Sequence, residues 1–225
     1  MAADVDLDRA VRCGFPEVIY GEGKPTALIL EILQRQADAG QCGFVTRVSP
    51  EQADEICAAL PDAAYNVAAR TIAAHGYPPP NETSGATAVV SAGSCDAPVA
   101  QEALETLLWM GVKCQLIEDV GVAGPQRLLR HVPVLQTMSA IVVVAGMEAA
   151  LPSVIGGHVG CPIIGVPTSV GYGASLHGFT ALLSMLTSCA SNVMTVNIDA
   201  GFRGGYAAGL IARQVVHSEE PAGHG

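Results

Sequence analysis

The feature that most constrains this fold is a series of five short apolar segments, separated from one another by stretches with helical spacing. Helices are expected near 96–110, 125–136, 148–157 and 178–190, with a last one over about 204–216. Strands that alternate with helices form right-handed crossovers, so the pattern predicts an α/β fold with a doubly wound parallel sheet. The five strand segments are TAVVSAG (87–93), VKCQLIE (112–118), AIVVVAG (140–146), PIIGVPT (162–168) and VMTVNID (193–199).

A proline-rich segment, YPPPNETSG at 77–85, divides the chain, because it can continue neither a helix nor a central strand. A small α/β domain is expected before it, over residues 1–80. That domain should contain the strands PEVIY and GFVTRVS, the helix TALILEILQRQADAG after Pro25, and the helix EQADEICAAL with Ser49 as its N-cap. Periodicity leaves open whether 65–74 is a strand or a helix. A larger domain is expected over 85–217, followed by a disordered tail at 218–225.

Composition and charge narrow the class of protein. Half of the 225 residues are hydrophobic and 14% are charged, which suits a parallel sheet buried on both faces and leaves little charge to cover a large free surface. We therefore expect part of the surface to be buried between subunits. A net charge of −10 argues against a nucleic-acid partner, although amides at helix starts still suit a phosphate-bearing ligand. The chain has no signal-peptide pattern and no uninterrupted apolar span, so we expect a cytoplasmic protein that does not insert into membranes.

Ligands of doubly wound sheets bind at the carboxyl ends of the strands. Glu148 lies in one such loop, AGMEAALP, where it either complements a helix dipole or serves as a general base. Another loop, SAGSCDAP, suits either a phosphate site or a plain helix cap. The other loops of this group are EDVGVAGP, VPTSVGYGAS and NIDAGFRGGY.

The seven cysteines form neither a C-x-x-C pair nor an even set, which argues against a disulfide framework or a structural zinc site. Cys189, in the polar segment TSCASNV, is expected on the ligand side of the sheet and is the candidate nucleophile. Cys95, in SAGSCDAP, is its rival. Cys57, Cys114 and Cys161 are expected to be packing residues. Metal-binding, P-loop, dinucleotide-fingerprint and serine-hydrolase motifs are absent from the sequence.

Several long motifs together resemble the LarB family, whose C-terminal domain is similar to PurE, the aminoimidazole ribonucleotide carboxylase/mutase. They are GSCDAPVAQEALETLLWMGVKCQLI, AGMEAALPSVIGG, CPIIGVPTSVGYGAS and TSCASNVMTVNID, with GFPEVIYGEGK and TRVSPEQA in the first domain. The resemblance implies a PurE-like, flavodoxin-like three-layer domain and a homo-octamer. PurE carries a histidine in a Ser-Ala-His-Arg type segment where this chain has EDVGVAG, a departure that counts against purine biosynthesis.

The resemblance also implies an activity. LarB proteins carboxylate the pyridinium ring of nicotinic acid adenine dinucleotide with CO2 or bicarbonate and hydrolyse its phosphoanhydride. The products are AMP and pyridinium-3,5-dicarboxylic acid mononucleotide, a precursor of the nickel-pincer nucleotide of lactate racemase. The essential cysteine of the family corresponds to Cys189 and its catalytic glutamate to Glu148. No tightly bound cofactor is expected, but Mg²⁺ held by substrate phosphates, with Asp96 as a candidate ligand, would assist hydrolysis.

A PurE-type carboxylase/mutase and a non-catalytic nucleotide-binding scaffold remain as alternative functions.

The expected substrate-binding residues come from the loops at the carboxyl ends of the strands and from basic side chains of the first domain. The expected substrate-binding residues are Ser94, Asp96, Asp119, Gly146, Met147, Ser169, Gly171, Tyr172, Gly173, Lys24, Arg47 and Arg70.

Overall fold

The computed structural model describes residues 4–215. The chain divides into two compact units, one formed by residues 1–79 with 108–111 and the other by residues 80–107 with 112–225. The division after residue 79 falls inside the proline-rich segment. The tail expected over 218–225 lies outside the described residues, as do the last two residues of the expected C-terminal domain.

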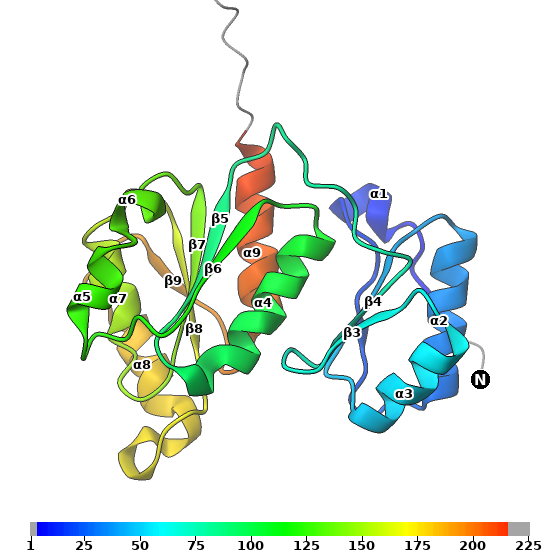
Figure 1. Cartoon of the computed structure of the whole chain (residues 1–225), viewed down its shortest axis with the longest axis horizontal. Coiled ribbons are helices and arrows are strands. Elements are labelled where there is room, and N and C mark those ends of the chain that lie inside the picture. Colours follow the sequence, from blue (N-terminus) through cyan, green and yellow to red (C-terminus); the bar gives the residue numbers. More distant parts are fainter. Residues whose placement is uncertain (1–3, 216–225) are drawn as a thin grey trace, which may run out of the picture. The chain divides into compact units, whose positions relative to one another are not determined.

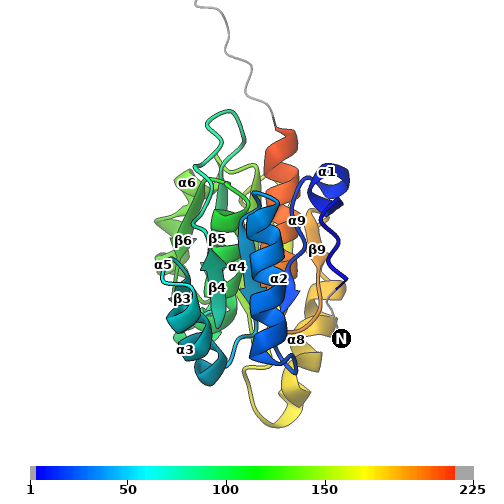
Figure 2. The same ribbon diagram turned by 90° about the vertical axis from the view of Figure 1, so that its right-hand side faces the viewer.

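The N-terminal unit contains a four-stranded sheet in the order β1-β2-β4-β3. Its strands are β1 (Ile19–Tyr20), β2 (Gly43–Thr46), β3 (Ala64–Asn66) and β4 (Thr71–Ala74), and only β1 and β2 are parallel to each other. The segment that periodicity left open is therefore a hairpin of β3 and β4. Helices α2 (Thr26–Asp38) and α3 (Pro50–Ala59) pack on one face of this sheet (Figures 1 and 2), while α1 (Arg9–Cys13) is a short N-terminal helix.

The start of α3 shows how local sequence fixes this unit. The Ser49 hydroxyl accepts a hydrogen bond from the Gln52 amide at 3.2 Å, and the Ser49 amide donates to Gln52 Oε1 at 2.9 Å. This capping box confirms Ser49 as the N-cap. The Gln52 side-chain amide also donates to the carbonyls of Gly21 and Lys24, at 3.0 and 2.8 Å. The loop after β1 is thus tied to the first turn of α3.

The C-terminal unit contains a five-stranded sheet in which every neighbouring pair is parallel, as predicted. The order β6-β5-β7-β8-β9 is the flavodoxin-like arrangement, with strand order reversing at β5 and β7. All residues of β5, β7 and β8 are buried, because helices cover both faces. The strands are β5 (Thr87–Ser91), β6 (Cys114–Ile117), β7 (Ala140–Ala145), β8 (Ile163–Pro167) and β9 (Val193–Thr195).

Helices on the two faces complete three layers (Figure 1). Helices α4 (Ala97–Trp109) and α9 (Gly201–Gln214) cover one face. The other face carries α5 (Pro125–Leu129), α6 (Val132–Leu135), α7 (Leu151–Gly156) and α8 (Phe179–Leu186). Two 3₁₀ turns, η1 (Ser94–Asp96) and η2 (Gly173–Gly178), precede α4 and α8.

Two helices differ from the sequence prediction for identifiable reasons. The helix expected over 125–136 is split into α5 and α6, because Pro133 has no amide to donate and its ring clashes with a carbonyl one turn earlier. The helix expected from residue 148 begins only at Leu151, because Met147 and Ala149 are left-handed, with φ of 54° and 51°. Glu148 consequently lies in a turn between strand and helix. Within residues 4–215, no helix combines the length and apolarity needed to cross a bilayer.

Candidate active site

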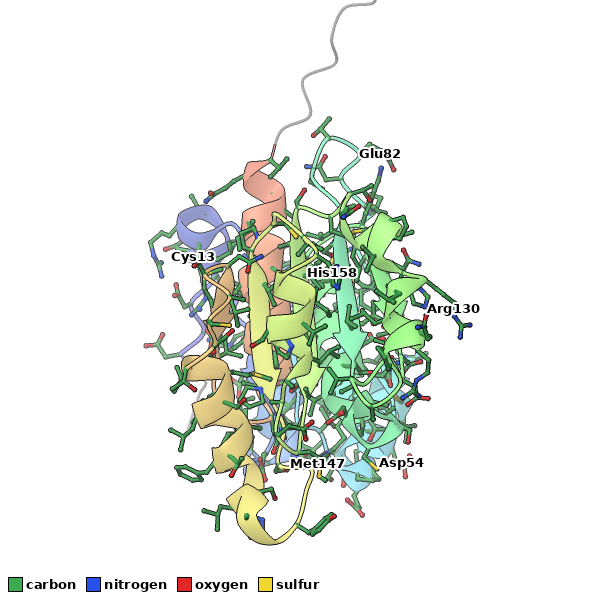
Figure 3. All side chains as sticks on the ribbon, turned by 90° about the vertical axis from the view of Figure 1, so that its left-hand side faces the viewer. Cys13, Asp54, Glu82, Arg130, Met147 and His158 are labelled. Atoms are coloured by element: carbon green, nitrogen blue, oxygen red, sulfur yellow. The ribbon has the colours of Figure 1, made fainter. Side chains whose placement is uncertain are left out.

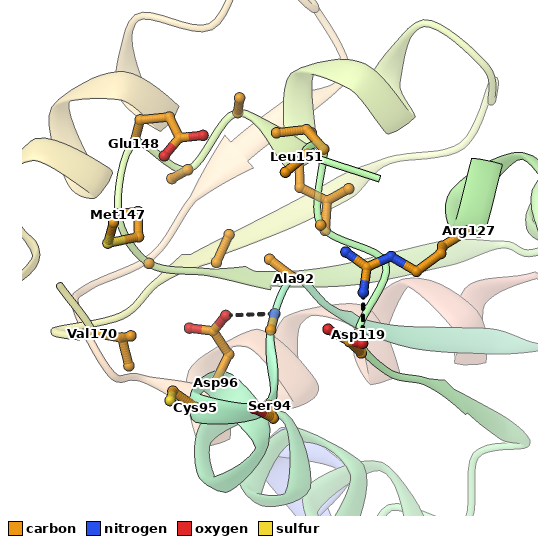
Figure 4. Close-up of a pocket in the computed structure, with 18 residues that line it drawn as sticks. Ala92, Ser94, Cys95, Asp96, Asp119, Arg127, Met147, Glu148, Leu151 and Val170 are labelled. Atoms are coloured by element: carbon orange, nitrogen blue, oxygen red, sulfur yellow. Dashed lines mark hydrogen bonds and ion pairs between the residues drawn. The ribbon is translucent and has the colours of Figure 1, made fainter. Parts of the chain in front are cut away.

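A cavity of about 480 Å³ opens at the carboxyl ends of β5, β6, β7 and β8 in the C-terminal unit (Figure 4). The loop after β5 leads to α4 on one face of the sheet and the loop after the neighbouring β7 leads to α7 on the other face, so these two loops diverge and leave a crevice between them. The lining comes from the loop after β5 (92–96), the loop after β6 with the first turn of α5, the loop after β7 (145–151) and Val170. This is where ligands bind in folds of this type.

The turn that carries Glu148 is held in a strained conformation. The amide of Met147 donates to the Val170 carbonyl at 2.9 Å, and the amide of Ala149 donates to the Gly146 carbonyl at 2.9 Å. A Cβ atom at Gly146 would stand only 2.5 Å from the Val170 carbonyl oxygen, so the tight approach requires glycine at this position. Left-handed backbone costs about 1 kcal/mol or more at each non-glycine residue. This strain, offset by the two hydrogen bonds, projects the exposed carboxylate of Glu148 at the cavity wall.

Asp96 lies in the cavity lining and is almost fully buried, with 4% of its surface exposed. Burial raises the pKa of Asp96, and this effect is opposed by hydrogen bonds from the Thr168 hydroxyl at 2.7 Å and the Gly93 amide at 2.9 Å. Both carboxylate oxygens therefore already accept a hydrogen bond. The arrangement locks the loop after β5 against the end of β8.

Asp119 and Arg127 form an ion pair on the other side of the cavity, with 2.6 Å between Arg127 Nη1 and Asp119 Oδ2. Asp119 follows β6 and is left-handed, with a φ of 57°. Arg127 projects from the first turns of α5, across the cavity from Glu148 (Figure 4). Both side chains are substantially exposed, so the ion pair is available to exchange partners with an incoming anion.

The charged groups of the lining are three carboxyl groups and one guanidinium, namely Asp96, Asp119, Glu148 and Arg127. The Glu148 carboxylate suits a cationic group of a ligand, whereas the guanidinium of Arg127 on the opposite side suits a phosphate. A ligand with a cationic ring at one end and phosphates at the other matches this distribution.

The two candidate cysteines differ in their position relative to this cavity. Cys95, the rival candidate, is exposed and lines it. Cys189 is also exposed but lies elsewhere. The prediction that Cys189 lies on the ligand side of the sheet is wrong within one chain, because its loop enters β9 rather than leaving a strand. A loop that enters a parallel strand lies at the amino-terminal edge of the sheet.

The strand register gives the separation between Cys189 and Glu148 along the strands. Val193, the first residue of β9, is level with Ile163, which is level with Ile141 near the start of β7. Glu148 follows the far end of β7, beyond Ala145. Four residues of strand span about 13 Å, so Cys189 and Glu148 are at least that far apart along the strands. Figure 3 shows the two edges, with Met147 near the lower end of the strands and His158 well above it.

Hydrogen bonds hold the Cys189 loop at that amino-terminal edge. The side-chain amide of Asn192 donates to the carbonyls of Val159 and Cys161, each at 3.1 Å. The hydroxyls of Ser188 and Ser153 lie 2.7 Å apart, which joins the loop to α7. The loop therefore cannot fold back toward Glu148 of the same chain without breaking these contacts.

The surface beside Cys189 is apolar. Leu183 and Leu186 of α8 are 58% and 61% exposed, and Met194 of β9 is 49% exposed. Phe179, one turn before Leu183, is also exposed, so α8 presents an apolar stripe away from its own core. Contiguous apolar patches of this kind are typical of interfaces between subunits.

The remaining cysteines agree with the packing interpretation. Burial raises the pKa of Cys114 to about 11 and also raises the pKa of Cys161. Neither thiol readily supplies a thiolate near neutral pH. Cys57 is half-buried on α3, where its sulfur contacts the Ala63 carbonyl at 3.8 Å.

The expected binding residues divide into three groups. Ser94, Asp96, Asp119, Gly146 and Met147 line the cavity together with Glu148. From the loop after β8, Val170 lines it, rather than the expected Ser169, Gly171, Tyr172 and Gly173. Lys24, Arg47 and Arg70 belong to the N-terminal unit, where Arg70 Nε donates to the Val48 carbonyl at 3.1 Å.

Sequence reasoning missed Arg127, the cationic member of the cavity lining. The signal for it was position: it lies two residues after EDVGVAGP, as the third residue of α5. Among residues 4–215, no three His, Cys, Asp or Glu side chains converge on a common point that could hold a metal ion. Asp96 is thus an isolated metal ligand at best, and a role for Mg²⁺ stays a prediction.

Comparison with known sequences decides the family. A family model described as the LarB/PurE-like N-terminal domain matches residues 1–76, and one described as AIR carboxylase matches residues 86–223. The chain belongs to the LarB family. The second match also confirms that the C-terminal domain of this LarB protein is PurE-like, and together the two matches make it a carboxylase-like protein.

Individual relatives show how much of the chain is matched, but their names do not state an activity for it. An uncharacterized protein of Methanocaldococcus jannaschii is 39% identical to this LarB chain over 219 residues, which cover 93% of the chain and 83% of the relative. Among solved structures, a crystal structure of a PurE2 variant of Treponema denticola is 16% identical and superposes with a TM-score of 0.44. It covers 54% of this chain and 76% of its own.

Proposed function

We propose that this protein carboxylates the pyridinium ring of nicotinic acid adenine dinucleotide and then hydrolyses its phosphoanhydride. The observation that carries the proposal is the charge distribution of the cavity, in which the Glu148 carboxylate lies opposite the Arg127 guanidinium across a crevice at the strand ends. A dinucleotide with a cationic ring and two phosphates is complementary to both walls. Membership of the LarB family supports the same substrate class.

The chemistry requires a nucleophile because a pyridinium ring is too electron-poor to attack CO2. A thiolate adds to ring carbon 4, which cancels the ring charge and makes carbon 5 an enamine-type nucleophile. Carbon 5 attacks CO2 to form the new carbon–carbon bond. A base then removes the proton from carbon 5, and the thiolate leaves carbon 4 with the electron pair of its bond as the aromatic ring reforms. One CO2 enters and one proton leaves.

Glu148 is the proposed base. Its carboxylate stands on a turn that two hydrogen bonds hold in a strained conformation, so its position is set before a ligand arrives. The carboxylate of Glu148 favours a cationic ring at this wall of the cavity. Binding of the cation therefore brings the reacting carbon to the wall that carries the base.

Cys189 is the proposed nucleophile, and it must come from a neighbouring subunit. Within one chain it lies at the opposite edge of the sheet from Glu148. It is exposed and adjoins the apolar stripe of α8, which would be buried by a second copy of the chain. A homo-oligomer, which the family resemblance puts at eight subunits, supplies such copies.

Arg127 is the proposed partner of the phosphoanhydride. Water attacks one phosphorus atom, the bridging oxygen leaves with the other phosphate, and the products are AMP and the dicarboxylated mononucleotide. Negative charge grows on the phosphate oxygens during this step, and a guanidinium stabilises that charge. Mg²⁺ would supply further charge neutralisation when bound by the substrate phosphates.

The test is incubation with nicotinic acid adenine dinucleotide, bicarbonate and Mg²⁺, followed by mass spectrometry of the products. Wild type should release AMP and a product that carries one additional carboxyl group. Cys189→Ala and Glu148→Gln should abolish carboxylation, whereas the exposed controls Cys13→Ala and Glu55→Gln should retain it. Full activity of Cys189→Ala together with loss in Cys95→Ala would transfer the nucleophile role to the cysteine that lines the cavity.

A parallel incubation with aminoimidazole ribonucleotide separates this proposal from the PurE reaction. Turnover of that substrate without carboxylation of the dinucleotide would refute the proposed function. Tight binding of the dinucleotide with no product at any bicarbonate or metal concentration would instead indicate a non-catalytic nucleotide-binding protein.

A further inference from the structure

A second, smaller cavity of about 270 Å³ adjoins the candidate active site. The two cavities share Asp119 and Arg127, whose ion pair stands between them. The smaller cavity is otherwise lined by Glu118, Val120, Arg130 and His131, from the end of β6 and the helices that follow. No sequence motif singled out Arg130 or His131, whereas Glu118 begins the loop EDVGVAGP.

The chemistry of this second cavity matches a nucleoside. The guanidinium of Arg130 and the imidazole of His131 are planar groups on which a purine base can stack. The exposed carboxylate of Glu118 is an acceptor for the hydroxyls of a ribose, the role that acidic residues play in dinucleotide-binding folds. Its lining is mostly polar, unlike the apolar wall that Ala145, Ala149 and Leu151 give to the larger cavity.

We propose that the smaller cavity is the subsite for the adenosine monophosphate half of the dinucleotide. The inference rests on the proposed function and extends it to the part of the substrate that is not carboxylated. The pyridinium half then occupies the larger cavity beside Glu148, and the phosphoanhydride crosses Arg127 at their boundary. The two cavities adjoin each other at the Asp119–Arg127 pair, and together they still fall within the usual volume range of ligand pockets.

The shared ion pair gives this arrangement a mechanism for binding. In the free protein Asp119 neutralises Arg127 across 2.6 Å, in a pair that remains substantially exposed to water. Phosphate oxygens offer the guanidinium a bidentate partner with more charge, so the incoming phosphoanhydride displaces Asp119. After hydrolysis the two products lie on opposite sides of Arg127, and each leaves through its own cavity.

The subsite is tested by titration calorimetry with three probes: nicotinic acid adenine dinucleotide, nicotinic acid mononucleotide and AMP. The double variant Arg130→Ala/His131→Ala should weaken binding of the dinucleotide and of AMP about tenfold, the loss of one stacked base. Its affinity for the mononucleotide should stay within about twofold of wild type. Arg35→Gln, which removes an exposed arginine of α2 in the N-terminal unit, is the matched control and should change none of the three affinities.

A second variant keeps the test decisive if the double variant does not fold. Glu118→Gln should weaken AMP about fivefold but leave 2′,3′-dideoxy-AMP unchanged, because only AMP presents the ribose hydroxyls. Unchanged dinucleotide affinity in both variants, or equal loss for dinucleotide and mononucleotide, would overturn the inference. If wild type binds the dinucleotide and the mononucleotide with equal affinity, the subsite inference is overturned but the proposed reaction stands. If wild type binds neither the dinucleotide nor the mononucleotide, the proposed function itself is overturned.

Discussion

Two inactive variants should restore activity when they assemble together. Cys189→Ala retains Glu148 and Glu148→Gln retains Cys189, so a mixed oligomer contains sites in which both native groups meet across an interface. If the two groups come from different subunits, a random equal mixture makes about one quarter of all sites native, and about one quarter of wild-type activity should return. If both groups came from one chain, no site in the mixture would be complete.

The strand register excludes the one-chain arrangement in this structure. The loop of Cys189 enters β9 level with Ile141, and Glu148 leaves β7 beyond Ala145, at least about 13 Å along the strands. A thiolate must come within bonding distance of ring carbon 4 while the base reaches the proton on the neighbouring carbon. One chain cannot meet both requirements with these loops in place.

The assay is co-expression of the two variants with different affinity tags, two-step purification of mixed oligomers, and mass spectrometry of the dicarboxylated product. Each variant purified alone gives the baseline, and co-expressed wild-type copies with the same tags give the maximum. Recovery near one quarter supports shared sites. Mixed oligomers that remain at the baseline would refute the reasoning, because their formation shows that the interface exists while no complete site forms.

Other parts of the structure give further expectations. Gly146→Ala should lower the free energy of unfolding by about 1–3 kcal/mol in urea titrations, because its Cβ would stand 2.5 Å from the Val170 carbonyl oxygen, whereas Gly160→Ala, which meets nothing within 4 Å, should not. The folded state binds the proton of Asp96 more tightly than the unfolded state, because burial raises the pKa of this carboxyl group. The free energy of unfolding should therefore fall as pH rises from the ordinary pKa of 3.8 through the raised native pKa. Unfolding titrations across this range should show a smaller fall in the free energy of unfolding for Asp96→Asn. Iodoacetamide labelling at about pH 8 should modify Cys114 more slowly than the exposed cysteines, because burial raises its pKa to about 11; rapid labelling of Cys114 in native protein would contradict its burial.

The parallel arrangement of the C-terminal sheet followed from the sequence because its central strands are short, apolar and bounded by turn residues. β5, β7 and β8 are buried on both faces, and a strand of that kind has no polar side to confuse the pattern. The hairpin of β3 and β4 was not decided by the sequence, since 65–74 mixes apolar and polar residues without a clear period. Pairing with β2 determines its conformation, and pairing is a long-range property.

The site was predicted unevenly for a similar reason. Glu148 and Asp96 lie in loops that leave strands, so the parallel topology alone brought them to one edge. Arg127 comes from a helix, and its direction depends on how α5 begins after Gly124, which periodicity does not describe. The splitting of the expected helix at Pro133 is likewise a local steric effect within an otherwise helical pattern.

Cys189 shows what a single chain leaves undetermined. Its motif indicates a nucleophile and its loop is polar, but a loop before a parallel strand lies at the amino-terminal edge of the sheet. In an isolated chain the apolar stripe of α8 next to it is exposed to water, which is unfavourable. Burial of the stripe against a second copy of the chain would remove this exposure. The same contact would carry Cys189 to another subunit's cavity. Assembly and catalysis then depend on one surface, so substitution of Leu183 or Leu186 by a charged residue should reduce oligomer formation and carboxylation together.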